Sequence, residues 1–547
     1  MKKKVFSMLL ATALTVSTVY ARQAGDVNSD GLVSATDSTY VLQKTLEKDF
    51  DLGDMGDLFA DTDADGEITA KDASLIFSHV LDGVTKLNKP DIPSELPEGF
   101  EHVPEDFTQT LTVSSYEELK NAIETLGTSS ANRAIYITED IYPTEQIKLS
   151  SQNANISFIG ITKADGTSPK LDFYKHRDSL QSRGSSGTGL MISGSYYNFK
   201  NLIVTNAGDC GTRIKGKTAG NCIFENCTFN YNNNSGISVT EGGHDNTFIG
   251  VDSYRNCDLC PRYGADADGF SIKLGAGDGN NCFSCRAWEN GDDGWDSYDQ
   301  AQHNGVYNIS YIDCLCWHNG DLDTFTCWDD YQRGLPPDER MLYIQAAIAQ
   351  VPDFLEKYNN HEYTQETWPD VTISLLGSKI KSSTINYDNW GGNPNGFKFG
   401  SEYSNPEQYR YVENCIAFEN GQKGFDMNNS KCKIDIHNTI GYDNGYDGKK
   451  GQDAEDANSN YILKCKIRGV TPAEMVVLSS SNNYSFNGKN PDVLPDNITT
   501  KEPTPEQQEA IRAEVDKVFG QIKANCQKDI INGVVSFDSI FDIVKGE

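Results

Sequence analysis

The chain has 547 residues, enough for two or three domains, and a formal net charge of −32. Such an acidic chain excludes nucleic acid as its ligand, because the phosphates would be repelled. Its 48 glycines, with abundant Asn and Asp, are typical of a β protein rich in turns rather than of a helical one.

Residues 1–21, MKKKVFSMLLATALTVSTVYA, have three lysines, then an apolar run, then small residues before a cleavage point after Ala21. This order predicts a secretory signal peptide and therefore a secreted, extracellular protein. No later stretch is apolar for long enough to cross a membrane.

Two Asp-rich segments, GDVNSDGLVSATD and ADTDADGEITAKD, each place oxygen donors at positions one, three, five, seven, nine and twelve of a calcium loop. The predicted ligands are Asp26, Asn28, Asp30, Leu32 through its carbonyl, Ser34 and Asp37, then Asp61, Asp63, Asp65, Glu67 through its carbonyl, Thr69 and Asp72. A helix-like segment follows each loop.

This pair of loops resembles a type I dockerin over residues 24–86. The resemblance implies a small all-α module that binds Ca2+ and a cohesin of a scaffolding protein, which would attach the chain to a cellulosome. Residues 87–107 contain four prolines among acidic residues and predict an extended linker to a large domain over residues 108–547.

The large domain is expected to begin with a short helix that has Ser115 as its N-cap and covers the end of a stacked β structure. From about residue 199 a segment ending in Asn then recurs, in most cases at steps of roughly 24 to 34 residues. The recurring residues are Asn232, Asn256, Asn290, Asn319, Asn389, Asn420 and Asn444. One Asn per coil predicts an asparagine ladder inside a parallel β-solenoid.

Two helical segments interrupt or follow the repeat. Residues 327–378 are predicted to be an insertion that contains an amphipathic helix of about five turns, and residues from about 503 a helix that caps the solenoid.

After each turn comes a glycine, then an apolar residue, then a variable one. Neighbours along a strand point to opposite faces, so core positions are followed by outward ones. The predicted core residues are Ile237, Phe270, Trp295, Phe397 and Phe425, and the outward residues are Ser238, Ser271, Asp296, Lys398 and Asp426. Asp296 and Lys398, expected two coils apart, would be separated by about 10 Å.

Four carboxylates crowd this region: Asp268, Asp292, Asp293 and Asp296. Like charges so close repel one another unless protons or a cation neutralise them, and hard oxygen donors favour Ca2+. Four of the 14 cysteines, Cys257, Cys260, Cys282 and Cys285, have the spacing of a zinc ribbon; buried thiols or a local disulfide are the alternative.

The motifs ADGF, CRAWENGDDGWD, NGFK and KGFDMNN resemble, in order and spacing, the family 9 polysaccharide lyases over most of residues 110–480. The resemblance implies an all-β, right-handed parallel β-helix that cleaves pectate by β-elimination. It assigns catalytic Ca2+ to Asp268, Asp292, Asp293 and Asp296, and the general base to Lys398.

A lysine base must be unprotonated when it takes the C5 proton of a uronate. A neighbouring cation or burial would lower its pKa, and we expect activity to be highest at alkaline pH. Arg262, Lys273 and Arg286 lie near the acidic cluster in sequence; they are either substrate-binding cations or solvated charges.

Three alternatives stay open. The first is a rhamnogalacturonan lyase, because the sequence does not separate polygalacturonate from rhamnogalacturonan I as the substrate, nor endo from exo cleavage. A polygalacturonase-type hydrolase is the second alternative. The segment CGTRIKG contains a RIK tripeptide, Arg213 to Lys215, that resembles the RIK of polygalacturonases. A noncatalytic solenoid that binds pectin is the third. The protein is expected to act as a monomer.

Overall fold

The structure is a computed structural model. It describes residues 25, 27, 33–46, 50, 52, 60–62, 68–82, 96–180, 186–258, 264–303, 305–320, 332–338, 340, 342–360, 362–363, 369, 371–375, 378–381, 392–445, 460–467, 471–488 and 492–546. The signal peptide predicted for residues 1–21 lies outside these residues. The chain divides into two compact units, Met1–Ser94 and Glu95–Glu547, and each is described by itself.

In the first unit, helix α1 (Ala35–Leu46) packs against α3 (Ala70–Asp82). Their small apolar core contains Val41 and Ile76, and the Ser38 hydroxyl donates to the Ala73 carbonyl at 2.7 Å. The helices predicted after the two loops are therefore present.

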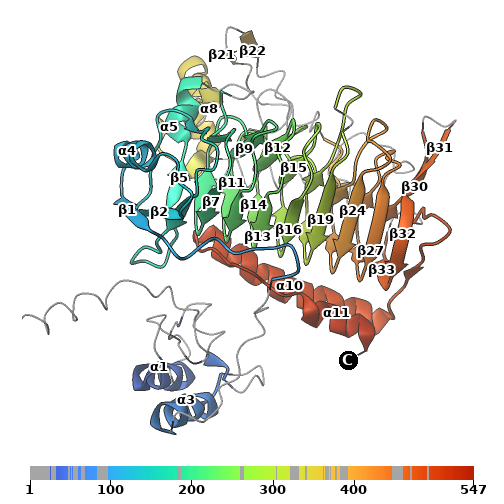
Figure 1. Ribbon diagram of the computed structural model, residues 1–547, viewed down its shortest axis with the longest axis horizontal. Helices are drawn as coiled ribbons and strands as arrows, with labels where there is room; N and C mark the ends of the chain where they lie inside the picture. The colour runs from blue at the N-terminus through green and yellow to red at the C-terminus, as the bar shows by residue number, and fades with distance from the viewer. Residues whose placement is uncertain are drawn as a thin grey trace, which may run out of the picture. The chain divides into compact units, whose positions relative to one another are not determined.

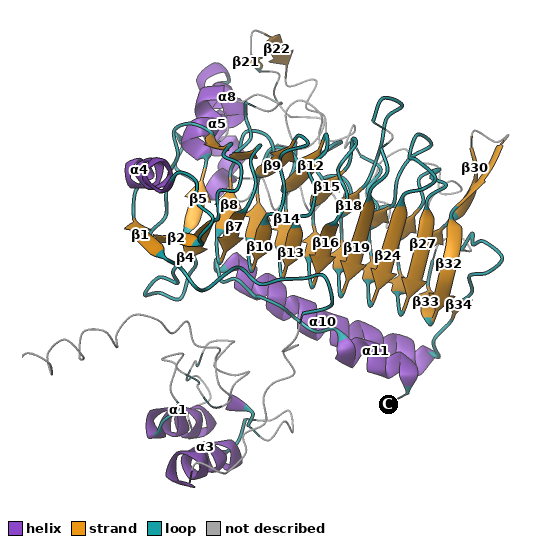
Figure 2. Ribbon diagram, viewed as in Figure 1, coloured by secondary structure: helices purple, strands orange, loops and turns teal. Residues whose placement is uncertain are grey.

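The second unit is a solenoid whose strands form three parallel sheets, which run side by side along it in Figures 1 and 2. In the described part of the chain, sheet A consists of β1 (Gln109–Val113), β2 (Arg133–Ile137), β4 (Ile156–Gly160), β7 (Tyr197–Lys200), β10 (Ile223–Glu225), β13 (Thr247–Ile249), β16 (Asn280–Phe283), β19 (Asn308–Ile312), β24 (Tyr409–Glu413), β27 (Lys433–His437) and β32 (Val476–Ser481). Sheet B consists of β5 (Lys170–Asp172), β8 (Ile203–Thr205), β11 (Thr228–Asn230), β14 (Asp252–Tyr254), β17 (Arg286–Trp288), β20 (Leu315–Trp317), β25 (Ile416–Phe418), β28 (Ile440–Tyr442), β33 (Asn483–Phe486) and β34 (Thr500–Lys501). Sheet C, which carries the outward residues predicted above, consists of β3 (Ile147–Leu149), β6 (Leu190–Ile192), β9 (Thr212–Lys215), β12 (Ile237–Thr240), β15 (Phe270–Ile272), β18 (Trp295–Asp296), β23 (Phe397–Lys398), β26 (Phe425–Asp426) and β29 (Tyr461–Ile462). The predicted parallel β-helix is confirmed.

Helix α4 (Tyr116–Leu126) follows the first strand, β1, rather than opening the domain, and it has Ser115 as its N-cap as predicted. Helix α5 (Tyr174–Leu180) follows β5. A short antiparallel hairpin, β30 (Lys464–Ile467) with β31 (Thr471–Glu474), leaves the solenoid near its other end.

The asparagine ladder is buried at the turn between sheets B and C. Each rung's Nδ2 donates to the Oδ1 of the next rung at 2.9–3.0 Å, through Asn232, Asn256, Asn290, Asn319, Asn420, Asn444 and Asn460. Asn389, predicted as a rung, lies outside the described residues, and Asn319 bonds Asn420 directly. Asn460 is a rung that the repeat alignment missed.

The core positions of sheet C are aromatic and stack on one another coil by coil. Ring centroids lie 4.9 Å apart for Phe270 and Trp295, 4.7 Å for Trp295 and Phe397, and 5.1 Å for Phe397 and Phe425. This column confirms the predicted inward phase of the strands. The strands of sheet C are short, but they pair in a single register because a shift by one residue would move the aromatic rings into solvent.

The same register corrects the predicted spacing of the outward residues. Strand β18 pairs directly with β23, so Asp296 lies opposite Lys398 on the neighbouring coil rather than two coils away. The coil that contains Asn319 has strands in sheets A and B, and its chain then leaves for the insertion before β23.

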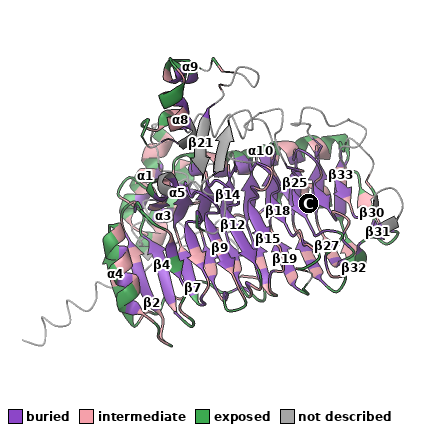
Figure 3. Cartoon of the chain, turned by 90° about the horizontal axis from the view of Figure 1, so that it is seen from above, coloured by how far each residue is buried: buried purple, intermediate pink, exposed green. Residues whose placement is uncertain are grey.

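In the described part of the insertion, the predicted long helix is divided into two short ones. Helix α8 (Leu342–Gln350) ends before Pro352, and α9 (Phe354–Asn359) starts after Asp353, which has a positive φ of 58°. A hairpin, β21 (Thr372–Leu375) with β22 (Ser378–Lys381), follows them. Helix α8 lies near α5 in Figures 1 and 3.

The C-terminal helices are α10 (Pro505–Gln527) and α11 (Asp538–Lys545). The sequence predicted that this segment caps an end of the solenoid, but the helices lie along its flank instead (Figure 1). Phe519 of α10 packs on Trp288, Trp317 and Phe418 of successive sheet B strands, with ring centroids 5.0–6.0 Å apart. The outward face of sheet B is apolar along this line, and the helix buries it.

The segment before β1, assigned above to the linker, also packs on the solenoid. Phe100 is buried with Ile249 and Phe283 on sheet A, and the Val103 amide donates to Glu225 at 2.9 Å. The second unit therefore includes residues 96–107, and prolines there order an extended segment against the sheet.

The described cysteines are free and buried. Cys285 follows β16 and its thiol donates to the Phe248 carbonyl at 3.4 Å, so this cysteine packs in the core. The buried-thiol alternative therefore holds for Cys257, Cys282 and Cys285; Cys260 lies outside the described residues. None of the described helices is long and apolar enough to cross a membrane.

Candidate active site

The acidic cluster lies on the outward side of sheet C, where three consecutive coils meet. Asp268 stands in the turn before β15, and Asp293 and Asp296 flank the turn into β18. In this part of the solenoid, carboxylate oxygens of these three residues lie within 4.8 Å of one another. All three are buried, Asp296 being 2% exposed.

Lys398 reaches the cluster from β23. Its Nζ lies 2.8 Å from Asp293 Oδ2 and 3.4 Å from Asp296 Oδ1, and the residue is 5% exposed. Asn395 holds the other oxygen of Asp293 through its backbone amide and its Nδ2, both at 2.8 Å. The turn before Lys398 thus fixes the carboxylate that the lysine contacts.

Lys273, at the end of β15, is the second cation in the cluster. Its Nζ lies 2.7 Å from Asp268 Oδ2 and 2.6 Å from Asp296 Oδ2. The Ser271 hydroxyl also donates to Asp268. Of the three cations predicted to line the site, Lys273 is therefore the one the structure places there, and it touches the carboxylates themselves.

The fourth predicted ligand, Asp292, is not part of the three-carboxylate group. Its side chain lies against Gly392, where any Cβ would collide with Asp292 Oδ1. That oxygen is buried and has no hydrogen-bond partner. An unpartnered buried oxygen beside three converging carboxylates is a donor set that fits a hard divalent cation such as Ca2+.

Burial and neighbouring charge act in opposite directions on these groups. Burial and the charge of Asp296 raise the pKa of Asp293 to about 7, against the opposing effect of Lys398. Burial and Asp293 raise the pKa of Asp292 well above its usual value. For Asp296 burial also raises the pKa, but Lys273 and Lys398 outweigh it and lower the pKa overall.

The pKa of Lys398 moves in the direction opposite to the expected one. Burial lowers it, but the carboxylates of Asp293 and Asp296 outweigh burial and raise the pKa well above its usual value. The expectation of a lowered pKa is therefore wrong for the chain by itself, because the lysine's nearest neighbours are anions.

The other two predicted cations are not in the cluster. Arg286 is fully buried on sheet B, where its guanidinium forms two bonds to Asp252 at 2.6 and 2.8 Å and one to the Gly533 carbonyl under the C-terminal segment. Its prediction as a substrate-binding residue is wrong, because Arg286 belongs to a strand of sheet B and not to sheet C, which carries the cluster. Arg262 lies outside the described residues.

The two loops of the first unit close in the same way. Asp37 accepts the amides of Val27 and Ser34 at 3.0 and 2.9 Å, and Asp72 accepts those of Thr62 and Thr69 at 2.8 and 2.9 Å. Ser34 and Asp61 are also described, whereas Asp26, Asn28, Asp30, Leu32, Asp63, Asp65 and Glu67 lie outside the described residues.

Next to the acidic cluster, towards the N-terminal coils, sheet C carries a cavity of about 370 Å³. Lys273 and Tyr298 line it on the side of the cluster, and Asp209 and Arg213 on the other side. Arg213 donates to Asp209 at 2.6 Å. The sequence singled out Arg213 only for its resemblance to hydrolases; its position in the outward row with Asp296 follows from the strand register.

The fold and the site define a parallel β-helix protein with converging carboxylates and lysines on one outward face, joined to a two-helix module with duplicated loops. Family models match both parts. Residues 105–330 match the Pel9A-like right-handed β-helix region, and residues 24–81 match the type I dockerin domain. Both expected resemblances are therefore confirmed.

Among curated relatives, pectate lyase L of Dickeya chrysanthemi is 28% identical over 274 residues, 50% of this chain and 48% of the relative. Pectate lyase L of Paenibacillus polymyxa is 27% identical over 311 residues, 55% of this chain and 53% of the relative. The chain spans about half the length of these relatives. The solved structure of pectate lyase Pel9A is 21% identical, with a TM-score of 0.44, over 70% of this chain and 80% of that one. The matched family region contains the acidic cluster and ends before Lys398.

Proposed function

We propose that the second unit is a Ca2+-dependent polysaccharide lyase that cleaves pectic uronans such as polygalacturonate by β-elimination. The observation that carries the proposal is the contact of a buried lysine amine with converging carboxylates, Lys398 Nζ to Asp293 at 2.8 Å. A base beside a cation-binding group is what removal of a proton next to a carboxylate requires. The names of the relatives support the same reaction class.

Asp268, Asp293 and Asp296 would hold the ion, with Asp292 beside them. When bound, Ca2+ supplies positive charge that stabilises the negative charge developing on the substrate carboxylate. The protein's own contribution is to place the base. The paired strands β18 and β23 hold Lys398 opposite Asp296, and the stacked rings of Trp295 and Phe397 beneath them keep this register.

In the reaction, neutral Lys398 Nζ takes the C5 proton of the uronate. The C5–H electron pair forms the C4–C5 double bond, the C4–O4 bond breaks, and the departing O4 takes a proton from solvent. Lys398 has to lose its own proton first, so activity should increase with pH through the alkaline range.

The test is the chemistry of the product. The protein is incubated with polygalacturonate, with Ca2+ or with a chelator, and the ultraviolet absorbance of unsaturated ends is followed across pH. We expect absorbance to rise only with Ca2+, and faster at alkaline pH. New reducing ends without new absorbance would identify a hydrolase, and binding without cleavage a noncatalytic solenoid; either outcome refutes the lyase.

We further infer that the first unit binds Ca2+ in both loops and attaches the secreted monomer to a cohesin, and so to a cellulosome. The duplicated closure of the loops by Asp37 and Asp72 supports this inference, because both halves then present the same ligand positions. A cohesin pull-down with and without a chelator tests it; binding that survives the chelator contradicts it.

A further inference from the structure

A single row of outward side chains runs along sheet C from its first strand to the acidic cluster. The strand pairings place these residues opposite one another on successive coils: Lys148, Met191, Arg213, Ser238, Ser271 and Asp296. Lys398 follows Asp296 on the next coil. At about 4.8 Å per coil, Lys148 lies six steps, or about 29 Å, from Lys398.

The charges along this row differ on the two sides of the cluster. On the N-terminal side the row contains two cations, Arg213 and Lys148, with serine hydroxyls between Arg213 and the cluster. On the C-terminal side the residue after Lys398 is Asp426, which pairs with Lys423 at 3.1 Å. Asp426 is thus neutralised by its ion pair, and Arg213 is paired with Asp209, whereas the exposed Lys148 has no ion pair in the described part of the chain. The N-terminal side is therefore the side that attracts a polyanion.

Arg213 has donors that its ion pair does not use. Its Nη2 bonds Asp209, but its Nε is buried without a hydrogen-bond partner, and the side chain is 18% exposed to the neighbouring cavity. The buried Nε cannot reach the cavity, but the exposed part of the guanidinium lines it and can form a charge-assisted hydrogen bond to a carboxylate there.

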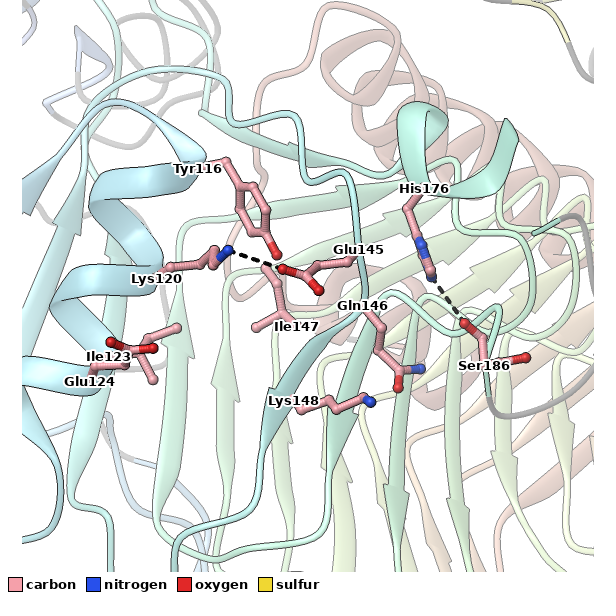
Figure 4. A pocket seen from close by; sticks show the side chains of 10 residues that line it. All are labelled: Tyr116, Lys120, Ile123, Glu124, Glu145, Gln146, Ile147, Lys148, His176 and Ser186. Carbon is pink, nitrogen blue, oxygen red and sulfur yellow. Dashed lines mark hydrogen bonds and ion pairs between the residues drawn. The ribbon is translucent and has the colours of Figure 1, made fainter. Parts of the chain in front are cut away.

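The row ends at a separate cavity of about 410 Å³ beside α4, α5 and β3, shown in Figure 4. Tyr116, Lys120 and Glu145 form one side of it, with Lys120 paired to Glu145 at 3.0 Å. His176 bonds the Ser186 carbonyl on the other side. Lys148 is exposed between them, and its amine has no ion pair or hydrogen bond within the described part of the chain.

We propose that this row is the binding track for the substrate chain, and that the cavity at Lys148 is a distal subsite that takes a uronate carboxylate. The track combines hydroxyl groups with cations at intervals, which matches a chain of sugars carrying carboxylates. The proposal rests on the proposed function for the identity of the substrate. It adds that the bound polysaccharide extends from the acidic cluster towards the N-terminal coils, and that long polysaccharides are bound better than short ones.

The experiment compares two probes, polygalacturonate and trigalacturonate, on the full-length protein. A trimer that occupies the cluster is too short to reach Lys148. We expect Lys148→Ala to lower the ratio of kcat/KM for the polymer to that for the trimer about five-fold, as for the loss of one exposed ion pair. Lys148→Glu should lower the ratio further because it adds repulsion.

The matched control is Lys528→Ala, an exposed lysine at the end of α10, which should leave the ratio unchanged. An unchanged ratio in both Lys148 variants overturns the track. If the unaltered protein cleaves neither probe, the proposed function fails, and the track is judged by binding. Affinity electrophoresis with polygalacturonate should then show weaker retention of Lys148→Glu, and equal retention would overturn it.

Discussion

Asn319 joins the coils on either side of the insertion, and replacing it with Ala tests whether those coils are direct neighbours. Its Nδ2 donates to Asn420 at 2.9 Å and to the Ala287 carbonyl at 3.1 Å. Its Oδ1 accepts the backbone amide and Nδ2 of Asn290 at 3.2 and 3.0 Å. Asn319→Ala therefore leaves four buried partner groups without their bonds to this side chain.

A buried group left unsatisfied costs about 1–3 kcal/mol. Two of these partners keep other hydrogen bonds, since Asn290 Nδ2 also donates to the Ser253 carbonyl at 3.0 Å and Asn420 Oδ1 still accepts the Asn319 backbone amide at 3.3 Å. We therefore expect a loss of roughly 2–6 kcal/mol in the free energy of unfolding, and a fall in Tm on the order of 2–6 °C for a unit of this size.

Thermal unfolding followed by circular dichroism measures the effect. The control is Asn497→Ala: this exposed residue donates one bond, to the Val477 carbonyl at 2.9 Å, and its loss should cost less than about 1 kcal/mol. Equal Tm values for the two variants would show that Asn319 is not a buried rung and would refute the direct pairing of its coil with that of Asn420.

Three further changes test other parts of the structure. Lys273→Met removes a cation that competes with Ca2+ for Asp268 and Asp296, so calorimetry should show tighter Ca2+ binding; weaker binding would make Lys273 a support of the site. Glu289→Gln breaks the ion pair to α10, where Glu289 lies 2.6 Å from Lys523. Burial raises the pKa of Glu289, but its cationic partners outweigh this and lower it, so its stabilisation is present above the unfolded pKa and lost as pH falls through the folded one. The Tm difference from the unaltered protein should shrink in acid; a constant difference would contradict the charge effect. Asp37→Ala with Asp72→Ala should abolish cohesin binding and leave polygalacturonate cleavage unchanged, whereas a loss of both would show that the two units depend on each other.

Periodic features of the fold could be predicted from the sequence because each coil repeats the same physical requirements. A buried Asn on successive coils from Asn232 onward, an apolar residue at the start of each sheet C strand from β12 onward, and the Ser115 cap follow from local patterns. Pattern alone does not show which strands pair, and it leaves out Asn460, the rung to which Asn444 donates. The position of α10 depends on the apolar outward face of sheet B, which no single segment reveals.

In the candidate site, too, some residues could be predicted from the sequence and others could not. Asp268, Asp293 and Asp296 could be predicted because their motifs fix which face they occupy, and Lys398 because it shares their strand phase. Arg286 was assigned to the wrong face because nearness in sequence says nothing about which sheet a residue joins. The direction in which the Lys398 pKa shifts could not be predicted, because it depends on distances that the sequence does not give. Lys398 lies 2.8 Å from Asp293, and at that distance the carboxylates outweigh burial.

The measurement that tests the central claim most directly is the rate of formation of unsaturated ends from polygalacturonate by Lys398→Met in saturating Ca2+. Loss of a general base predicts a fall of about 10²- to 10⁴-fold in kcat at alkaline pH. Lys423→Met, which removes a lysine paired to Asp426 one coil away, should stay close to the unaltered protein. A Lys398→Met variant that is folded, binds Ca2+ and retains full activity would contradict the account.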